Sequence, residues 1–459
     1  MVFLRSFFKK DFVNLEVIFK RKTISSSYSK TSTLLVSSLI VSGILSSNFY
    51  SDKAHAGGFA IREQSTLGLG AAFAGIAAGD ELSSIYWNSA AVASAGIGLT
   101  TESHYAVIVP SVTIDPDEGL FGGLLSTSAT DIGKTALVPA SYGSWRINDK
   151  VVIGYGFNAP FGLSTEPDDR GYAGQFDARK AALKTLNFNP VLGYQISPTL
   201  NVGVGLQVMY SELKIKQAIT LGGFPSATNP SSNLKGDDWS YGFTAGFLWK
   251  PVKGTSLGVG YRSRMETTLE GDLNVDGFPA LSRGIKAEGF DLPDMVTVSF
   301  RQDLSDSLRL LGTFEWSNWS VLQVVTITDS TTGAFVSSFS PKWDDGYFFS
   351  AGLEYDYNSK LTLRTGVAYE QSPIQEASQR LLSIPDTDRV WLSAGATYKW
   401  SEQTSFDIAY THIFGDDSPI SSASSFTGEV EADVDIIGVS MKTKWGADGP
   451  FGLLKGLSR

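Results

Sequence analysis

The sequence predicts an all-β protein, a fourteen-stranded antiparallel barrel that crosses a membrane. Three observations lead to this prediction. Short turns and long loops alternate between the strand-like segments, these segments run for about ten residues, and apolar residues alternate in them with polar or small ones. Transmembrane barrels have short turns at one end and long loops at the other. Soluble sandwiches have no reason to sort their connections in this way.

The composition agrees with a sheet that faces lipid. The chain of 459 residues has 12% aromatic residues, 47 glycines and 18% charged residues. This charged fraction is below the roughly 25% typical of soluble domains. No run of about 20 apolar residues could span a membrane as a helix. The net charge of −10 offers little support for nucleic acid binding, and the absence of cysteine excludes disulfides and thiolate-bound zinc.

Residues 1–56 are predicted to be a cleaved signal peptide. A basic region precedes the apolar stretch 34–45, and Ala54-His55-Ala56 has the small-x-small pattern of a cleavage site. Cleavage there would make Gly57 the first residue of the mature chain. The basic region is longer than usual, so either the leader is extended or the true start lies downstream of Met1.

Residues 57–95 are predicted to form a hatch, a plug inside the barrel. The segment is rich in Ala and Gly, and its apolar residues do not alternate for long. A barrel of fourteen strands is too wide for its own side chains to fill. We therefore expect this segment to pack into the lumen rather than to form a disordered tail.

Residues 96–445 are predicted to form the barrel, followed by a C-terminal tail at 446–459. In 200–210, for example, Val204 and Leu206 fall on one face and Asn201 and Gln207 on the other. Many of these segments end in aromatic residues, as expected at membrane interfaces. The fourteen strands are expected to begin near Gly96, Ala136, Lys150, Leu183, Leu200, Asp237, Thr255, Leu292, Ser307, Trp343, Lys360, Asp388, Thr404 and Glu431.

No motif supports an enzyme, a metal site or a cofactor. Gly254-Thr-Ser-Leu-Gly258 matches a nucleophile elbow in letters, but it lies in a tight turn that leads into a strand. The two histidines beyond the leader, His104 and His412, have no second ligand-type cluster beside them. Inward-facing charges are interpreted as a solvated lumen wall, from which a subset could bind a ligand head group: Arg262, Arg301, Glu354, Arg364, Glu370, Lys399, Lys442 and Lys444.

Three stretches carry a resemblance to a known family. Asn158-Ala-Pro-Phe-Gly-Leu-Ser-Thr-Glu166, Leu361-Thr-Leu-Arg-Thr-Gly-Val-Ala-Tyr369 and Ser383-Ile-Pro-Asp-Thr-Asp-Arg-Val-Trp-Leu-Ser-Ala-Gly395 resemble the outer-membrane long-chain fatty acid transporter family, the FadL type. The resemblance covers residues 57–445. It implies a barrel of the bacterial outer membrane that imports hydrophobic molecules without energy input. We expect the barrel to be a monomer. In that family a hatch fills the barrel, and ligand leaves sideways at a kink in strand three.

The resemblance assigns hatch residues to this chain. Asn88-Ser89-Ala90 stands where the family has Asn-Pro-Ala, so Ser89 departs from the pattern and puts the rigid turn in doubt. The hatch N-terminus, with Gly57 and Phe59, is expected to close an inner pocket until ligand displaces it.

The lateral opening is assigned to Pro160, Phe161 and Gly162. Gly162 matches the glycine of the family's kink, and Pro160 cannot donate a ladder hydrogen bond.

Ligand-binding residues are expected in the loops after strands three and five. The apolar capture residues are Leu163, Phe176, Ile219, Leu221 and Phe224, together with Phe161. Lys214 and Lys216 resemble the family's head-group region, although Gln217 replaces its arginine. Arg380 matches an arginine in the long loop before strand twelve.

The favoured function is passive transport of hydrophobic small molecules across the outer membrane, with long-chain fatty acids as ligand. Aromatic hydrocarbons taken up by the same route are the alternative within this class. The rival from another class is a shut barrel whose loops serve as an adhesin or phage receptor.

Overall fold

The computed structural model describes residues 57–117, 128–220, 226, 228–422 and 426–446. The predicted signal peptide and, apart from Gly446, the predicted C-terminal tail lie outside the described residues.

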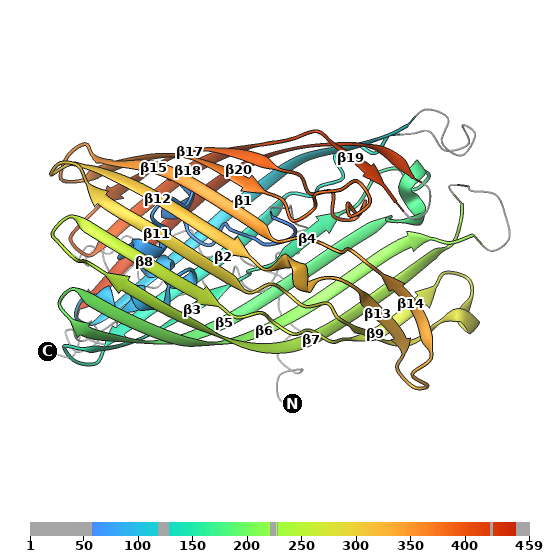
Figure 1. Cartoon of the computed structure of the whole chain (residues 1–459), viewed down its shortest axis with the longest axis horizontal. Helices are drawn as coiled ribbons and strands as arrows, with labels where there is room; N and C mark the ends of the chain where they lie inside the picture. Colours follow the sequence, from blue (N-terminus) through green and yellow to red (C-terminus); the bar gives the residue numbers. More distant parts are fainter. Residues whose placement is uncertain (1–56, 118–127, 221–225, 227, 423–425, 447–459) are drawn as a thin grey trace, which may run out of the picture. The chain divides into compact units, whose positions relative to one another are not determined.

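The strands form a closed antiparallel barrel of fourteen wall positions, as the sequence predicts (Figure 1). The first and last strands close it, because β1 pairs with β20 along the whole of β1. Six positions consist of two strands each. The positions are β1 (Leu99–Pro116), β2 (Ala136–Arg146), β3 (Val151–Asn158) with β4 (Gly162–Thr165), β5 (Lys180–Ser197), β6 (Leu200–Ala218), β7 (Ser231–Trp249), β8 (Thr255–Arg262) with β9 (Leu269–Val275), β10 (Arg283–Glu288) with β11 (Met295–Asp303), β12 (Leu308–Ser317) with β13 (Val325–Asp329), β14 (Phe335–Phe339) with β15 (Gly346–Asp356), β16 (Leu361–Gln371), β17 (Arg389–Lys399), β18 (Thr404–Gly415) with β19 (Ser418–Ser421), and β20 (Thr427–Gly446).

Two of the predicted long loops are largely strand. The long connections expected before the strands that begin near Leu292 and Trp343 contain β9 with β10 and β13 with β14, respectively. These strands pair with one another, and β10 also pairs with β13. Their many Thr, Ser, Asp and Gly residues weaken the sequence signal for strands, but pairing between neighbours stabilises strands at the long-connection end of the wall.

The period-two alternation separates an outer apolar face from an inner one. On β6, Val204 and Leu206 are 57% and 64% exposed, whereas Asn201 and Gln207 are buried. Trp239 and Tyr241 on β7 are also exposed. Apolar side chains thus point outward and polar or small ones inward, which is the reverse of a soluble protein and fits a wall that lipid surrounds.

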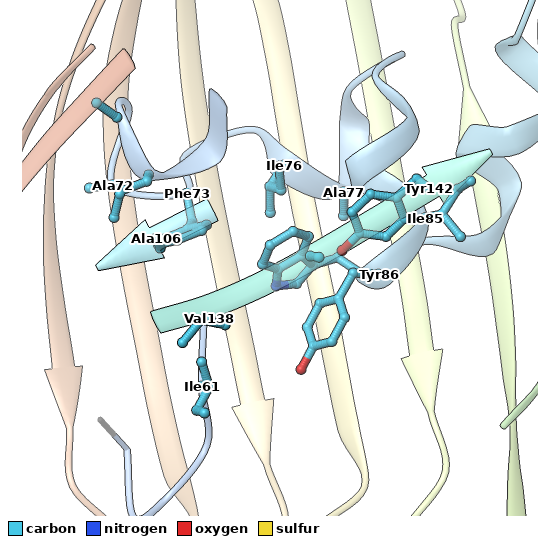
Figure 2. Packing of buried hydrophobic residues seen from close by; sticks show 14 of the residues in the cluster. Ile61, Ala72, Phe73, Ile76, Ala77, Ile85, Tyr86, Ala106, Val138 and Tyr142 are labelled. Atoms are coloured by element: carbon cyan, nitrogen blue, oxygen red, sulfur yellow. The ribbon is translucent and has the colours of Figure 1, made fainter. Parts of the chain in front are cut away.

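The segment 57–95 packs against inward-facing residues of the wall. It contains α2 (Thr66–Leu69) and the short 3₁₀ helices η1 (Ile76–Ala78), η2 (Leu82–Tyr86) and η3 (Ser89–Ser94); three more lie in connections, η5 (Ala173–Phe176), η6 (Pro279–Leu281) and η7 (Trp319–Val321). Figure 2 shows Phe73, Ile76 and Tyr86 beside Val138 and Tyr142 of β2. None of the described helices is long and apolar enough to cross a membrane.

Glycines on the inner face allow this close packing. Cβ atoms added at Gly246 and Gly260 would collide with the side-chain oxygen of Asn88 and the carbonyl oxygen of Trp87. The turn at Asn88 is itself well fixed. Its side chain accepts a hydrogen bond from Ala90 N at 3.0 Å and donates to Ala77 O and Phe247 O at 2.7 and 2.9 Å. The Asn88 amide thus fixes a turn in which the sequence lacks proline.

A pair of substitutions on β7 tests this packing. Gly246→Val places a branched side chain against Asn88, whereas Ala245→Val adds bulk on the outer face. We expect Gly246→Val to lower the free energy of unfolding by about 1–3 kcal/mol and Ala245→Val to change it little. Thermal unfolding in detergent measures both. Equal effects at the two positions would contradict close packing of the inner segment.

Candidate functional site

The third wall strand is interrupted. β3 ends at Asn158 and β4 begins at Gly162, with Pro160 between them. Pro160 has no backbone N–H to donate to a ladder. Among the described residues, β3 pairs with both β2 and β5, whereas β4 pairs with β5 and has one isolated bridge, between Thr165 and Gly133, on its other side. The wall therefore loses a pairing partner at this break.

The neighbouring strand shows the same gap from the other side. Residues 136–140 of β2 pair with β1, but the ladder to β3 uses only Ser141–Arg146. Beyond the gap, Lys134 N donates to Ser164 O at 3.3 Å and Glu166 N donates to Ile132 O at 2.8 Å. Strand pairing is thus missing between β2 and β4 over a short, bounded stretch.

Residues 59–61 pair with the broken strand from inside. Ile61 N donates to Pro160 O at 2.8 Å, Gly162 N donates to Phe59 O at 2.9 Å, and Ala60 and Phe161 form an antiparallel bridge. Backbone groups that β2 does not reach are therefore satisfied by the start of the described chain. The predicted hatch N-terminus and the predicted kink are in direct contact.

Phe59 lies in a cluster of aromatic side chains. Its ring centroid is 4.7 Å from Trp319, 5.7 Å from Trp343, 5.7 Å from Phe290 and 6.2 Å from Phe161, distances typical of favourable aromatic pairs. These five residues, here called the aromatic cluster, are all buried. They come from four separate parts of the wall and from the inner segment.

Apolar residues extend the aromatic cluster along the barrel interior. Leu163, next to the break, packs in the same core as Leu183, Met209, Leu213 and Leu292. Gly58 leaves room for the indoles, because a Cβ there would lie 2.9 Å from Trp319. The interior beside the broken strand is therefore an apolar environment that Phe59 fills.

Charged residues hold the same part of the inner segment. Arg62 contacts Glu315 at 2.6 Å and Glu370 at 3.0 Å. Arg389 contacts Glu370 at 3.1 Å and Asp386 at 2.7 Å. We call these five residues the charged cluster. All five are buried, so each charge depends on its partners, because an unpaired charge in this position would be strongly destabilising.

The charged cluster also reaches the backbone of the inner segment. Gly58 N donates to Asp386 Oδ2 at 2.8 Å, and Ser372 Oγ donates to the same oxygen at 2.6 Å. Burial raises the pKa of Asp386, while Arg389 and these donors oppose the rise. Opening this end of the segment would separate Gly58 from Asp386 and Arg62 from its two glutamates.

Glu63 lies beside the charged cluster and is buried. Burial raises the pKa of Glu63 to about 7; its own backbone N–H opposes the rise, and the nearby negative charge of Glu370 adds to it. The carboxyl group therefore changes its charge near neutral pH, while it remains in an environment that disfavours the ionised form.

A polar cavity lies at the short-turn end of the barrel. Its volume is about 560 Å³, and its lining includes Glu354, Arg364, Lys399 and Lys442 together with Leu67 of the inner segment. Glu354 contacts Arg301, Arg309 and Arg364 at 2.6–2.8 Å. This end of the interior is water-compatible, in contrast to the apolar end around Phe59.

The remaining predicted ligand residues lie in different places. Phe176 ends η5 and packs on a separate apolar core, and Ile219 N donates to Pro230 O at 3.0 Å. Leu221 and Phe224 lie outside the described residues. Arg380 is buried and donates to the carbonyl oxygens of Asp386, Ile374 and Pro419, which gives it a structural role in its loop.

Lys214 and Lys216 point outward. They share the β6 face with Val204 and Leu206. The adjacent Leu213 has the opposite parity and packs in the apolar core of the interior. In this arrangement they do not reach an interior ligand. The family resemblance placed them near a head group, but the parity of β6 directs them to the outside of the wall.

Sequence reasoning missed Phe290, Trp319 and Trp343, and it did not connect Arg62 with Glu315. These residues are separated by more than two hundred positions from Phe59 and Arg62. Their local sequence gives no sign of this role, except that the tryptophans lie in connections between strands, where the aromatic residues of a membrane interface are not expected. Barrel closure brings them together.

Most of the chain matches a known family and several of its relatives. The model of a family described as outer membrane protein transport protein (OMPP1/FadL/TodX) matches residues 47–445. The 47 kDa outer membrane protein of Pasteurella multocida (strain Pm70) is 29% identical over 412 residues, covering 84% of this chain and 92% of that protein. A long-chain fatty acid transport protein of Escherichia coli O6:H1 is 30% identical over 404 residues, covering 80% and 88%.

Solved structures share the fold. The crystal structure of a Pseudomonas aeruginosa FadL homologue superposes with a TM-score of 0.75 at 22% identity, covering 84% of this chain and 99% of that one. The toluene transporter TbuX of Ralstonia pickettii has a TM-score of 0.65 at 17% identity, covering 83% and 97%.

Removing the Arg62 charge tests the charged cluster. Arg62→Met leaves Glu315 and Glu370 with fewer counter-charges in a buried site, and we expect the docked inner segment to lose about 3–5 kcal/mol. Hydrogen exchange of residues 57–65 should become much faster. As a control, Lys250→Met breaks the exposed pair with Asp80, which is worth about 0–1 kcal/mol. Unchanged protection of residues 57–65 from hydrogen exchange in Arg62→Met would contradict a stabilising role of the charged cluster.

The pH dependence follows from the raised pKa of Glu63. Because the folded pKa of about 7 exceeds the ordinary value of 4.5, the folded state binds more protons than the unfolded state between these values. Stability should therefore fall as pH rises from about 4.5 through 7. Glu63→Gln should flatten this part of the profile. Thermal midpoints of both proteins between pH 5 and 8 provide the measurement, and parallel profiles would contradict the assignment.

Proposed function

The chain belongs to the outer membrane protein transport protein family (OMPP1/FadL/TodX), whose members carry hydrophobic compounds across the bacterial outer membrane, and we propose that it carries long-chain fatty acids. Ligand enters the apolar interior from the long-connection end. It leaves sideways between β2 and β4. The segment that begins at Gly57 acts as the hatch.

One observation carries the proposal: the broken strand is paired by Phe59–Ile61 rather than by β2. A transmembrane wall is normally paired along its whole length, because lipid offers no hydrogen bonds to exposed backbone. A gap is tolerated where protein covers it from inside. A segment that covers the gap and also fills the apolar interior is suited to open the gap and the interior in one movement.

The ligand must replace what Phe59 contributes. A fatty acyl chain in the aromatic cluster would bury apolar surface at about 25 cal/mol per Å². This gain offsets the loss of the Phe59 contacts and of the two backbone hydrogen bonds to Pro160 and Gly162. Ligand would thus bind the displaced form better than the closed form, as a population shift requires.

The long-chain assignment is supported by the relative named as a long-chain fatty acid transport protein, at 30% identity. Aromatic hydrocarbons are the competing ligand class, since the aromatic cluster offers ring faces as well as apolar volume. Solved toluene transporters share the fold at lower identity. A shut barrel that serves only as an adhesin or phage receptor predicts no uptake of either class.

Uptake into proteoliposomes tests the lateral route. Gly162→Val adds a branched side chain at the buried start of β4, on the residue whose N–H donates to Phe59 O. We expect it to reduce the uptake rate of labelled oleate at least about tenfold, which corresponds to about 1.4 kcal/mol in the barrier. Labelled toluene measured in parallel compares the two ligand classes.

A matched control adds bulk on the outer wall. Ala351→Val changes an exposed position on β15 and should leave uptake unchanged. Wild-type rates in Gly162→Val would reject the exit between β2 and β4. Absence of oleate uptake in the wild-type protein would reject fatty acid transport itself, and uptake of toluene alone would assign the hydrocarbon class.

A further inference from the structure

Four polar side chains surround one methionine on the inner face of the wall. Asn187 of β5 and Ser240 of β7 lie directly opposite Met209 of β6, one on each side. Ser211 follows Met209 by two positions, and Asn189 follows Asn187 by two, so both also face inward. All five side chains are buried, with no more than 2% exposed. We call the four polar residues, Asn187, Asn189, Ser211 and Ser240, the polar belt.

Each member of the polar belt has a polar atom without a hydrogen-bond partner in the described part of the chain. These atoms are Asn187 Oδ1, Asn189 Oδ1, Ser211 Oγ and Ser240 Oγ. Buried polar groups in proteins are nearly always hydrogen-bonded. Four such atoms around a single side chain therefore indicate a site that a polar group from outside the chain completes.

The amide nitrogens of the polar belt are already engaged. Asn187 Nδ2 donates to Asn158 Oδ1 at 3.1 Å, and Asn189 Nδ2 donates to Leu206 O at 2.5 Å. These bonds leave the two amide oxygens as the groups that can bind something else. The polar belt thus offers two acceptors together with two hydroxyls, and a hydroxyl can donate or accept.

The polar belt contains no charged side chain, and the charged residues around it are engaged elsewhere. Asp238 lies opposite Ser211 and accepts from Thr268 N at 2.9 Å. Arg262 donates to Tyr86 O at 3.0 Å and lies over the Tyr86 ring. An ionised carboxylate in the polar belt would therefore face two amide oxygens and the charge of Asp238. An uncharged group that donates a hydrogen bond fits these acceptors better.

The polar belt is level with the break in the third strand. Asn187 lies opposite Asn158, the last residue of β3. Thr185, two positions before Asn187, accepts from Phe161 N at 3.0 Å and donates to Phe161 O at 2.6 Å. A ligand on the proposed route between β2 and β4 therefore passes the polar belt.

Met209 joins the polar belt to the apolar interior. It packs in the same core as Phe59, Leu163 and Leu213. Methionine is unbranched and flexible, so it can fill a space and pack differently when another group enters. An acyl chain that takes the place of Phe59 would bring its head group to the polar belt.

We propose that the polar belt is a head-group site for the transported ligand and binds a hydroxyl or an un-ionised carboxyl group. This inference rests on the proposed transport function and narrows its ligand class. The O–H of such a head group donates to an asparagine oxygen, and its own oxygen accepts from a serine hydroxyl. A hydrocarbon has neither group, so it leaves the polar belt unsatisfied.

The un-ionised form also suits the step that follows. Burial disfavours a charged carboxylate, so a carboxylic acid in this interior takes up its proton. An uncharged head group then enters the surrounding lipid at a lower cost than an ion. The polar belt thus selects amphiphiles over hydrocarbons at the level where the ligand leaves the barrel.

Four ligands with the same acyl chain test the proposal: oleyl alcohol, methyl oleate, oleyl sulfate and octadecene. The alcohol donates a hydrogen bond, the ester only accepts, the sulfate stays ionised, and the hydrocarbon has no head group. Equilibrium binding to the full chain in nanodiscs, with empty nanodiscs subtracted, gives each affinity. We expect the alcohol to bind at least about tenfold tighter than the other three, because only the alcohol donates to the buried acceptors.

Two variants change the polar belt directly. Asn187→Leu removes an acceptor at similar side-chain size, and Ser240→Ala removes a hydroxyl. Each should weaken alcohol binding by at least about fivefold and leave octadecene binding unchanged. Asn201→Leu is the matched control, because Asn201 is a buried residue on the inner face of β6 at its short-turn end. Heat-dependent gel mobility checks folding, and Ser240→Ala carries the test if Asn187→Leu does not fold.

Three results would overturn the inference. Equal affinities for oleyl alcohol and octadecene would show that the polar belt does not contact the ligand. Tightest binding of oleyl sulfate would show that the head group binds as an anion. If Asn187→Leu or Ser240→Ala weakens the alcohol and octadecene by the same factor, the polar belt has a structural role only.

Oleate uptake separates this inference from the proposed function. Uptake of labelled oleate together with any of these three results rejects the polar belt as a head-group site and leaves transport standing. Absence of oleate uptake, with no binding of any of the four ligands, rejects the transport function and this inference together.

Discussion

The backbone hydrogen bonds between residues 59–61 and the broken third strand join the wall of the barrel to the segment inside it. A wall in lipid must satisfy its backbone polar groups within the protein, and Pro160 interrupts the ladder where β2 and β4 no longer meet. The inner segment supplies the missing partners, with Ile61 N on Pro160 O and Gly162 N on Phe59 O. The integrity of the wall at this point therefore depends on what occupies the interior.

Two kinds of interaction act on the same short stretch of chain. The aromatic cluster surrounds Phe59, and the charged cluster holds Arg62 and the N–H of Gly58. The first is non-directional and can be replaced by another apolar group. The second cannot be replaced by an apolar group, because buried charges need partners of opposite charge. In the proposed transport cycle, a ligand would compete for the apolar contacts, while the ion pairs would determine where the segment returns after the ligand has left.

The inner and outer surfaces of the wall place different requirements on the side chains of the same strands. Inside, Gly246 and Gly260 allow the segment around Asn88 to approach the backbone. Outside, β6 carries the lipid-facing Leu206, then Tyr210, which packs against Trp239 of β7, and then the outward-facing Lys214 and Lys216. The period of two allows one strand to meet both requirements, since neighbouring residues never share a face. Polar residues also divide the interior lengthwise, with a charged cavity at the short-turn end.

Local pattern alone determined the all-β class, the fourteen wall positions, and the break at Pro160, because alternation, turn residues and proline act over a few neighbouring positions. It also contained the outward direction of Lys214 and Lys216, which follows from their parity with Leu206, although the family resemblance pointed elsewhere. Only the tertiary structure decided which residues meet Phe59 and Arg62. Trp319, Glu315 and Glu370 lie far along the chain, and closure of the sheet with its register places them around one segment, which no short-range pattern encodes.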